Sequence, residues 1–331
     1  MKDALLPLLA CPHCGGDLNL LTIRREGEDI MEGSLTCTSC GTAFPVRSGV
    51  PRFAEDVTEV QERTADAFGY EWNRYSGIDA RYRQQFLDWI APVQPESFVG
   101  RNVLEGGCGK GRHTALAAEF GARNVVAIDL SSAVEAAFAN TRHLPNAHIV
   151  QGDLNRPPVK RVFQLAYSVG VLHHLPDPER GFHALVSKLE PGGSIAAWVY
   201  GREGNGWIVH LVSPVRERVT VHLPHPVLDV LSGILTVPLF AATRLVYGPM
   251  RNSALGRKLP YQPYLSYIAT FGFKEHRTII FDHLVAPVAF YLRREEFAAW
   301  FERAGLEDVQ ISAHNANSWR GLGRVPGGTA A

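Results

Sequence analysis

The chain has 331 residues, more than a single compact core usually contains, so one large domain with an accessory module is expected. Hydrophobic residues make up 46% of the sequence and charged residues 20%, an ordinary composition for a folded, soluble protein. Lys plus Arg and Asp plus Glu both number 33, so the formal net charge is zero. This balance argues against a protein that grips nucleic acid phosphates over a wide basic surface, and a nucleic-acid partner is disfavoured.

The apolar stretches of the chain predict neither a secretory signal nor a membrane span. Residues 5–10 are apolar, but the run is short and leads directly into a cysteine pair. The longest apolar stretch, residues 230–243, is shorter than the roughly 20 residues that span a bilayer, and it contains Pro238. A cytoplasmic protein is therefore expected.

Four of the five cysteines form two matched pairs, Cys11-x-x-Cys14 and Cys37-x-x-Cys40. Each pair can present two thiolates to one tetrahedral ion, and the 22 residues between the pairs allow a hairpin to return. A glycine follows the second cysteine of each pair and permits a tight turn there. We predict a structural zinc ion, Zn²⁺, in a module of residues 1–54; a redox dithiol is the less favoured alternative.

The remaining chain divides by its hydrophobic pattern. Residues 55–100 read as an N-terminal helical lid or linker. Over 101–200, short apolar runs alternate with helical patterns, which indicates an α/β fold with a parallel sheet covered on both faces. Residues 201–285 interrupt this rhythm with apolar helices rich in proline and aromatic residues, and we expect a helical cap there. The rhythm resumes over 286–325, and 326–331 read as a loose tail.

A glycine-rich turn follows the first predicted strand of the α/β region, in the order Val103, Leu104, Glu105, Gly106, Gly107, Cys108, Gly109, Lys110 and Gly111. Glycines let a ligand approach the backbone closely, and the N-terminus of the next helix offers free N–H groups. Such a turn does not by itself identify the ligand, because dinucleotide enzymes also carry one.

Three acidic residues then stand at the ends of three consecutive predicted strands. Glu105, Asp129 and Asp153 are each 24 residues apart, which is one strand and one helix per step. Successive strand ends lie along one edge of such a sheet, where open α/β sheets bind ligands. The first carboxylate would repel a pyrophosphate but attract an ammonium group, and the second can accept both hydroxyls of a ribose. The pattern favours a ligand with an aminoacyl end and a nucleoside end over a dinucleotide.

These motifs, with the segment from Ser168 to Leu175, resemble successive motifs of the class I S-adenosylmethionine-dependent methyltransferases. The resemblance covers about residues 57–200 well and 290–325 loosely. It implies a Rossmann-like, doubly wound sheet of seven strands with S-adenosyl-L-methionine as the cofactor. It assigns to the cofactor Glu105, Gly106, Gly107, Gly109, Gly111, Asp129, Leu130, Asp153, Leu154, Ser168, Val169 and, in the lid, Tyr75.

The acceptor of the methyl group is less defined by the sequence. The fourth strand lacks the Asn/Asp-Pro-Pro-Tyr-like turn of amine-modifying family members, which favours the small-molecule branch, similar to enzymes of ubiquinone and menaquinone biosynthesis. The apolar cap suggests a lipophilic or aromatic acceptor, or a lipid-linked one at a membrane surface; a homodimer interface is the alternative use of these residues. His283 and His174 are candidate bases, each weighed against a structural role.

The N-terminal module resembles the small zinc-ribbon proteins that activate RNA and translation-factor methyltransferases. A methyltransferase of RNA or protein, with the ribbon as an in-cis activator, is therefore a second hypothesis. A non-catalytic scaffold that binds the cofactor or S-adenosylhomocysteine is a third. In each case we expect the ribbon to pack on the α/β domain.

Overall fold

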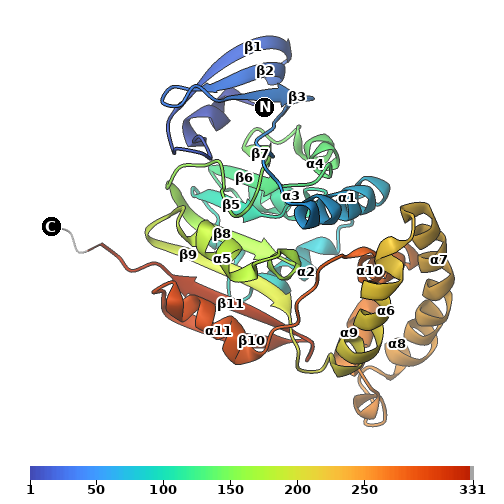
Figure 1. The fold of residues 1–331 in the computed structure, drawn as a ribbon. Coiled ribbons are helices and arrows are strands. Elements are labelled where there is room, and N and C mark those ends of the chain that lie inside the picture. The colour runs from blue at the N-terminus through green and yellow to red at the C-terminus, as the bar shows by residue number, and fades with distance from the viewer. Residues whose placement is uncertain (329–331) are drawn as a thin grey trace.

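The computed structural model describes residues 1–328; the end of the predicted tail, 329–331, lies outside the described residues. A small N-terminal sheet lies against one end of a central α/β domain, and a group of helices lies beside that domain (Figure 1). The chain passes through these parts in order, and its last helix and two strands return to the central sheet.

The N-terminal sheet is antiparallel and follows a short 3-10 helix, Asp3–Leu8. Its strands lie in chain order, and alternate side chains of the second strand are buried, which is typical of a sheet with one covered face. The four strands are β1 (Leu18–Glu26), β2 (Asp29–Cys37), β3 (Ala43–Arg47) and β4 (Val50–Pro51). The hairpin between β1 and β2 brings the two cysteine pairs to the same end of the module.

The central sheet has seven strands in the order β10-β11-β9-β8-β5-β6-β7, as the resemblance implied. β5 to β9 are parallel, and only β11 pairs antiparallel with both of its neighbours. The strands are β5 (Asn102–Gly106), β6 (Asn124–Asp129), β7 (Ala147–Gln151), β8 (Phe163–Val169), β9 (Leu189–Tyr200), β10 (Glu307–His314) and β11 (Ser318–Arg324).

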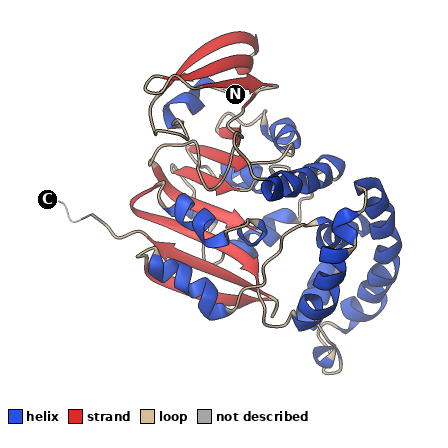
Figure 2. Ribbon diagram, viewed as in Figure 1, coloured by secondary structure: helices blue, strands red, loops and turns tan. Residues whose placement is uncertain are grey.

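Helices cover both faces of this sheet (Figure 2). Successive residues of β5 point to opposite faces: Leu104 packs in one core with Phe182 and Phe297, whereas Val103 packs in the other with Phe86. The helices of the first face are α5 (Pro178–Val186) and α11 (Arg294–Arg303), and those of the second include α2 (Tyr82–Ile90) and α3 (Arg112–Glu119). Helix α4 (Val134–Thr141) packs beside β7. The sheet is therefore doubly wound.

The lid and the cap are helical. Helix α1 (Glu59–Arg74) begins at a capping box in which Thr58 and Gln61 satisfy each other's free backbone N–H groups. The cap follows β9 and consists of η4 (Ile208–Val212), α6 (Ser213–Arg218), η5 (Thr220–His222), α7 (His225–Ala242), η6 (Thr243–Tyr247), α8 (Gly248–Met250), η7 (Gly256–Lys258), α9 (Gln262–Ile268) and α10 (Phe273–Val285).

His283 lies in the C-terminal turn of α10, within the helical cap that the sequence predicts. One feature of the cap differs from the sequence expectation. The apolar stretch 230–243 is part of an unbroken helical run, His225–Met250, that continues through Pro238. Among the described residues, that run is long and apolar enough to cross a membrane by length and composition.

The N-terminal module packs on the β7 edge of the central sheet. Arg52 forms a parallel bridge to Gln151, and the Phe53 N–H donates to the Gln151 carbonyl at 2.7 Å. Side chains from both parts share one hydrophobic core, in which Leu9 and Phe44 of the module are fully buried with Val150 of β7. The module and the sheet therefore form one folded unit, as expected.

Candidate functional site

The glycine turn lies between β5 and α3, at the carboxyl edge of the sheet. Gly107 has a φ of +81°, and a Cβ there would lie 2.2 Å from Val171 Cγ2, so no other residue fits without displacing the segment after β8. Gly109 also has a positive φ, and a Cβ on it would lie 3.0 Å from the indole nitrogen of Trp72. The turn is thus held between the tip of β8 and the lid helix α1.

Glu105 stands at the end of β5 with its carboxylate fully inside the protein. It accepts a hydrogen bond from the Thr114 hydroxyl, and the nearest cationic candidate, His113 Nδ1, is 3.9 Å away. Burial raises the pKa of Glu105 to about 8. A cation placed next to this carboxylate would remove that penalty, so the position suits the ammonium group of an aminoacyl ligand.

The other two predicted acids lie at the tips of the next strands. In the sheet Glu105 pairs with Ala127 of β6, and Asp129 pairs with Gln151 of β7, so the acids follow one edge as their spacing predicted. Asp129 accepts from the Gly109 N–H at 2.8 Å and from the Ser131 hydroxyl at 2.7 Å.

Asp153, the third of the predicted acids, lies two residues beyond the end of β7. It accepts from the Asn155 N–H at 2.9 Å in a tight turn, and Leu154 is buried beside it. On the other side of β5, the Ser168 hydroxyl donates to the Gly106 carbonyl at 2.8 Å and ties the tip of β8 to the glycine turn. The predicted cofactor residues therefore lie on four adjacent strand tips, β8, β5, β6 and β7.

The lid helix α1 closes over this edge. Asn73 Nδ2 donates to the Ser132 carbonyl at 3.2 Å, just after β6, and a surface depression beside it is lined by Tyr70, Asn73 and Ser132. The side chain of Trp72 covers the glycine turn, with Lys110 Nζ 5.3 Å from the centre of its ring.

Tyr75 was the lid residue assigned to the cofactor, but its hydroxyl donates to Asp229 of α7 at 2.5 Å. Its carbonyl accepts from Lys110 Nζ at 2.9 Å. Tyr75 therefore connects the lid, the glycine turn and the cap, and Trp72 is a second lid residue that contacts the turn.

A fourth carboxylate, Glu71 of α1, was not identified from the sequence. It is fully buried, and neither carboxylate oxygen has a hydrogen-bond partner among the described residues. Burial, reinforced by the nearby Asp282 carboxylate, raises its pKa well above the usual value, while Lys110 opposes the shift. An unpartnered buried carboxylate is costly, and a bound cation would relieve it. No periodicity marks Glu71, because only the three-dimensional fold shows that this acid faces inward.

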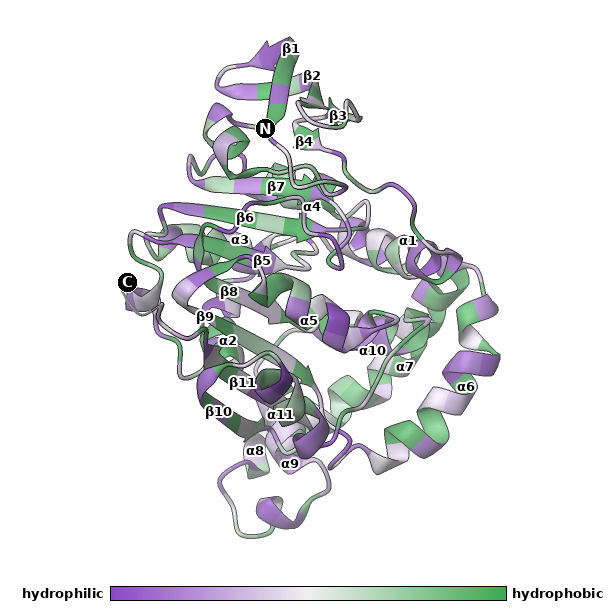
Figure 3. Cartoon of the chain, turned by 60° about the vertical axis from the view of Figure 1, so that its left-hand side comes forward, coloured by the Kyte–Doolittle hydropathy of each residue, from purple (hydrophilic) through white to green (hydrophobic). Residues whose placement is uncertain are grey.

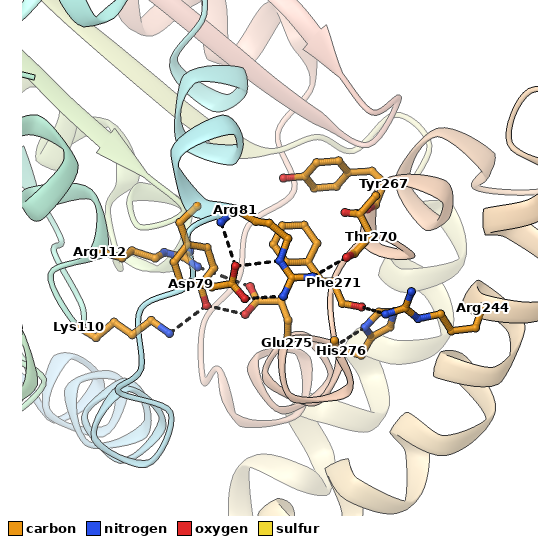
Figure 4. Close-up of polar contacts among 12 residues, drawn as sticks. Asp79, Arg81, Lys110, Arg112, Arg244, Tyr267, Thr270, Phe271, Glu275 and His276 are labelled. Atoms are coloured by element: carbon orange, nitrogen blue, oxygen red, sulfur yellow. Dashed lines mark hydrogen bonds and ion pairs between the residues drawn. The ribbon is translucent and has the colours of Figure 1, made fainter.

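A polar network joins the glycine turn to the cap (Figure 4). Lys110 Nζ lies 3.2 Å from the Tyr82 hydroxyl, which donates to Glu275 of α10 at 2.7 Å, and Arg112 lies 3.7 Å from the same carboxylate. Arg81 donates to the Thr270 carbonyl at 2.6 Å, close to the start of α10. The position of the cap is therefore linked to that of the turn.

The two candidate bases lie around Tyr200, the last residue of β9. The ring centre of Tyr200 is 5.7 Å from that of His174 and 6.0 Å from that of His283, and its hydroxyl donates to Asp282 at 2.7 Å. His174 Nδ1 donates to the Val288 carbonyl at 2.6 Å, so Nδ1 carries the proton and Nε2 is the basic nitrogen.

Burial keeps both rings uncharged near neutral pH. It lowers the pKa of His174 and of His283 below the ordinary histidine value, although Asp282 opposes the shift in each case. The neighbouring His173 is fully buried, and neither of its ring nitrogens has a partner within residues 1–328. The fold thus places uncharged histidine side chains, which can accept a proton, beside the tips of β8 and β9.

The four paired cysteines form a single cluster in the N-terminal module. Their sulfur atoms lie within 4.8 Å of one another, with 3.7 Å between Cys11 and Cys40 and 3.5 Å between Cys14 and Cys37. Four sulfurs bound tetrahedrally to zinc at about 2.3 Å would be about 3.8 Å apart, so the cluster fits this metal. The four thiolates would complete the coordination, which makes the site structural.

Replacing Cys40 by Ser should remove zinc and lower the melting temperature, because the metal connects the two halves of the module. Mass spectrometry of the purified protein should find about one zinc per chain in the parent and well below one in the variant. Ser39→Ala, an exposed neighbour in the same turn, is the matched control and should keep both the metal and the stability. Equal melting temperatures with and without zinc would contradict a structural role.

Two segments of the chain match family models. Residues 103–193 match a model described as a methyltransferase domain, and residues 2–49 match one described as a Trm112p-like protein. The tRNA U34 carboxymethyltransferase of Pseudoalteromonas atlantica is 33% identical over 124 residues, which covers 36% of this chain and 38% of that protein. The trans-aconitate 2-methyltransferase of Deinococcus radiodurans is 40% identical over 114 residues, which covers 34% and 42%. The similarity spans well under half the length of these relatives.

Among solved structures, magnesium protoporphyrin IX methyltransferase from Synechocystis with bound cofactor aligns with a TM-score of 0.46 and 11% identity, covering 82% of this chain and 99% of that one. The two family matches coincide with the glycine turn and with the cysteine pairs, and they confirm both predicted resemblances. The chain therefore carries a class I methyltransferase domain behind an N-terminal Trm112p-like zinc-ribbon domain.

Proposed function

We propose that the protein is an S-adenosylmethionine-dependent methyltransferase that modifies a proton-bearing group, such as a hydroxyl, on a small lipophilic acceptor. The observation that carries the proposal is the pairing of two sites at one sheet edge. Buried carboxylates surround the glycine turn, and neutral histidines lie beside the next strand tips. The first set suits a cationic cofactor and the second suits proton removal.

The residues present fit the cofactor. Glu105 and the unpartnered Glu71 are buried carboxyl groups whose ionised form a bound sulfonium and ammonium group would stabilise. Asp129 can accept the ribose hydroxyls, and Asp153 with Leu154 can hold the adenine. When bound, S-adenosylmethionine supplies a methyl group on a positively charged sulfur. The contribution of the chain is alignment, because in-line transfer depends mainly on the geometry of the reacting atoms.

A hydroxyl acceptor also requires removal of its proton. His174 follows the tip of β8 directly, and its hydrogen bond to the Val288 carbonyl fixes Nε2 as the proton-accepting atom. His283 approaches from the cap, next to Asp282, whose carboxylate is held by the Tyr200 hydroxyl. We assign proton removal to His174 and orientation of the acceptor to His283.

The names of the relatives support two acceptor classes. The first relative is named for a reaction on tRNA, which disagrees with the expectation that nucleic acid is disfavoured. The second is named for trans-aconitate, a small molecule. Each match extends over little more than a third of this chain, so neither identifies the acceptor. The apolar residues of α7 are exposed on the outside of the cap, and they favour the small lipophilic class as an acceptor that arrives from a lipid phase. RNA methylation with the zinc ribbon as an in-cis activator is the second candidate.

Incubating cell extract with the enzyme and cofactor labelled on the methyl carbon should separate the two candidates. The label should enter the organic-solvent fraction, in a product whose mass identifies an added methyl group. Extract treated with ribonuclease is the control and should give the same yield. Label confined to RNA, and lost after ribonuclease treatment, would establish the second candidate instead.

His174→Asn should lower kcat by about 10²–10⁴-fold, the usual contribution of a general base, with a smaller change in KM. The activity of the parent should fall as the pH drops through the lowered pKa of His174, because the protonated ring cannot accept a proton. The variant should lose this dependence. His283→Asn should chiefly raise KM, and His143→Asn, at an exposed position, is the control. An unchanged pH profile in His174→Asn would rule out the assigned role.

Glu105 should make cofactor binding depend on pH. Its pKa is about 8 in the ligand-free protein, so the carboxyl is largely protonated below that value and gains its charge as the pH rises. Calorimetry with S-adenosylhomocysteine should show affinity rising up to tenfold per pH unit below about pH 8 and levelling off above it. Glu105→Gln should bind roughly 10–100-fold more weakly. The same slope in the variant would show that another group controls binding.

A further inference from the structure

The longest helix of the cap has its polarity reversed relative to an ordinary surface helix. The residues that it turns inward are mostly polar, and those that it exposes are apolar. Its buried polar residues, with the π-helical turn that extends it, are Asp229, Ser232, Thr236 and Thr243. Its exposed apolar residues are Val227, Val230, Ile234, Leu235, Val237, Leu245 and Val246.

Hydrogen bonds and ion pairs hold α7 in this orientation. Arg277 of α10 donates to the Asp229 carboxylate and to its backbone carbonyl, each at 2.8 Å, and Tyr75 donates to the same carboxylate. Further along, the Thr243 hydroxyl lies 2.9 Å from His276 Nε2. Turning the apolar side inward would break these contacts and leave the mostly buried Arg277 side chain without its carboxylate partner, which is costly. The apolar face is therefore fixed on the outside.

Exposing such an apolar face to water is unfavourable. Ile234 is 63% exposed and Leu245 is 76% exposed, and residues 230–243 contain no charged side chain. Only 28% of the most apolar 18-residue window of His225–Met250 is buried, whereas the core helix of a water-soluble protein is mostly buried. Exposed apolar area of this extent marks an interaction surface.

A second exposed apolar row lies on the first helix of the cap. Trp207, Leu211, Val215 and Val219 follow one another at four-residue intervals and are all more than half exposed. This spacing places them along one side of η4 and α6. In Figure 3 hydrophobic residues recur along α6 and α7. In Figure 1 α7 forms the outermost layer of the molecule.

The exposed charged residues of the cap are mostly basic. Over 201–285 the exposed acidic residues are Glu203 and Glu217, and the exposed basic residues are Arg202, Arg218, Arg244, Arg251, Arg257, Lys258 and Lys274. Arg244 and Arg251 lie near the C-terminal end of the helical run that carries the exposed apolar residues of α7. An apolar face with basic residues around it matches the interface of an anionic bilayer, where acyl chains take the apolar side chains and phosphates take the basic ones.

We propose that the cap docks the protein on the surface of an anionic phospholipid bilayer, with α7 lying in the membrane plane. The helix does not span the bilayer, because its inner side is held by Arg277 and Tyr75. This docking deepens the proposed function, since a lipophilic acceptor dissolved in the bilayer would reach the site through the cap.

Flotation of the full chain with vesicles tests the docking without requiring catalysis. The protein should float with vesicles of phosphatidylglycerol and phosphatidylcholine, less with phosphatidylcholine alone, and less at high salt. Val230→Glu with Ile234→Glu should lower the vesicle partition coefficient at least tenfold. Leu21→Glu with Ile23→Glu, an equal double change at positions on the zinc ribbon that are 65% and 68% exposed, is the matched control and should leave it unchanged.

Three results would overturn the proposal. One is a parent protein that stays with the soluble fraction at every vesicle composition. Another is a parent dimer that Ile234→Glu converts to a monomer without any change in flotation, which would make the face a subunit interface. The third is RNA binding that depends on Arg251 and Lys258 and excludes vesicles. Calorimetry with S-adenosylhomocysteine on the same variants reports the cofactor site separately, so a failure of docking is distinguishable from a failure of the proposed function.

Discussion

Buried carboxyl groups around the glycine turn are the constraint on which the rest of the site depends. Glu105 at the tip of β5 and Glu71 in the lid are both removed from water, and neither has a cationic side chain within hydrogen-bonding distance. Leaving a buried carboxyl group without any hydrogen-bond partner, as in Glu71, costs roughly 1–3 kcal/mol, or more if the group stays charged. The protein bears this cost in the ligand-free state, and a cationic ligand would recover it on binding. Affinity and selectivity for a positively charged cofactor then follow from the same two side chains.

The lid, the turn and the cap are mechanically connected through a few polar side chains. Lys110 contacts the lid at the Tyr75 carbonyl and the second helix at the Tyr82 hydroxyl, and Tyr82 contacts Glu275 in the cap. Tyr75 reaches the cap a second time through Asp229. A change in the glycine turn on cofactor binding would therefore be transmitted to the helices that cover the acceptor. This arrangement suits an enzyme whose two substrates must be enclosed together.

Much of the fold was predictable because its signals are local. Strands β5 to β8 are short apolar runs, the acids at 105, 129 and 153 repeat with the strand–helix unit, and the cysteine pairs carry their own spacing. The remaining features of the site and the cap depend on tertiary contacts. Nothing local shows that Glu71 faces inward or that Tyr75 turns to Asp229. The helix through Pro238 packs along α10, a contact that no local pattern predicts. The inverted polarity of α7 becomes visible only once its inner side is known.

The position of the N-terminal module has a consequence for the solubility of the chain. Strand β7 is the last strand on its side of the central sheet, and an uncovered edge strand offers free N–H and C=O groups to other molecules. The module occupies this edge through Arg52 and Phe53. Because it precedes β7 in the sequence, it can fold around its metal before that strand leaves the ribosome. By covering the β7 edge, the zinc ribbon would then prevent intermolecular strand pairing during synthesis.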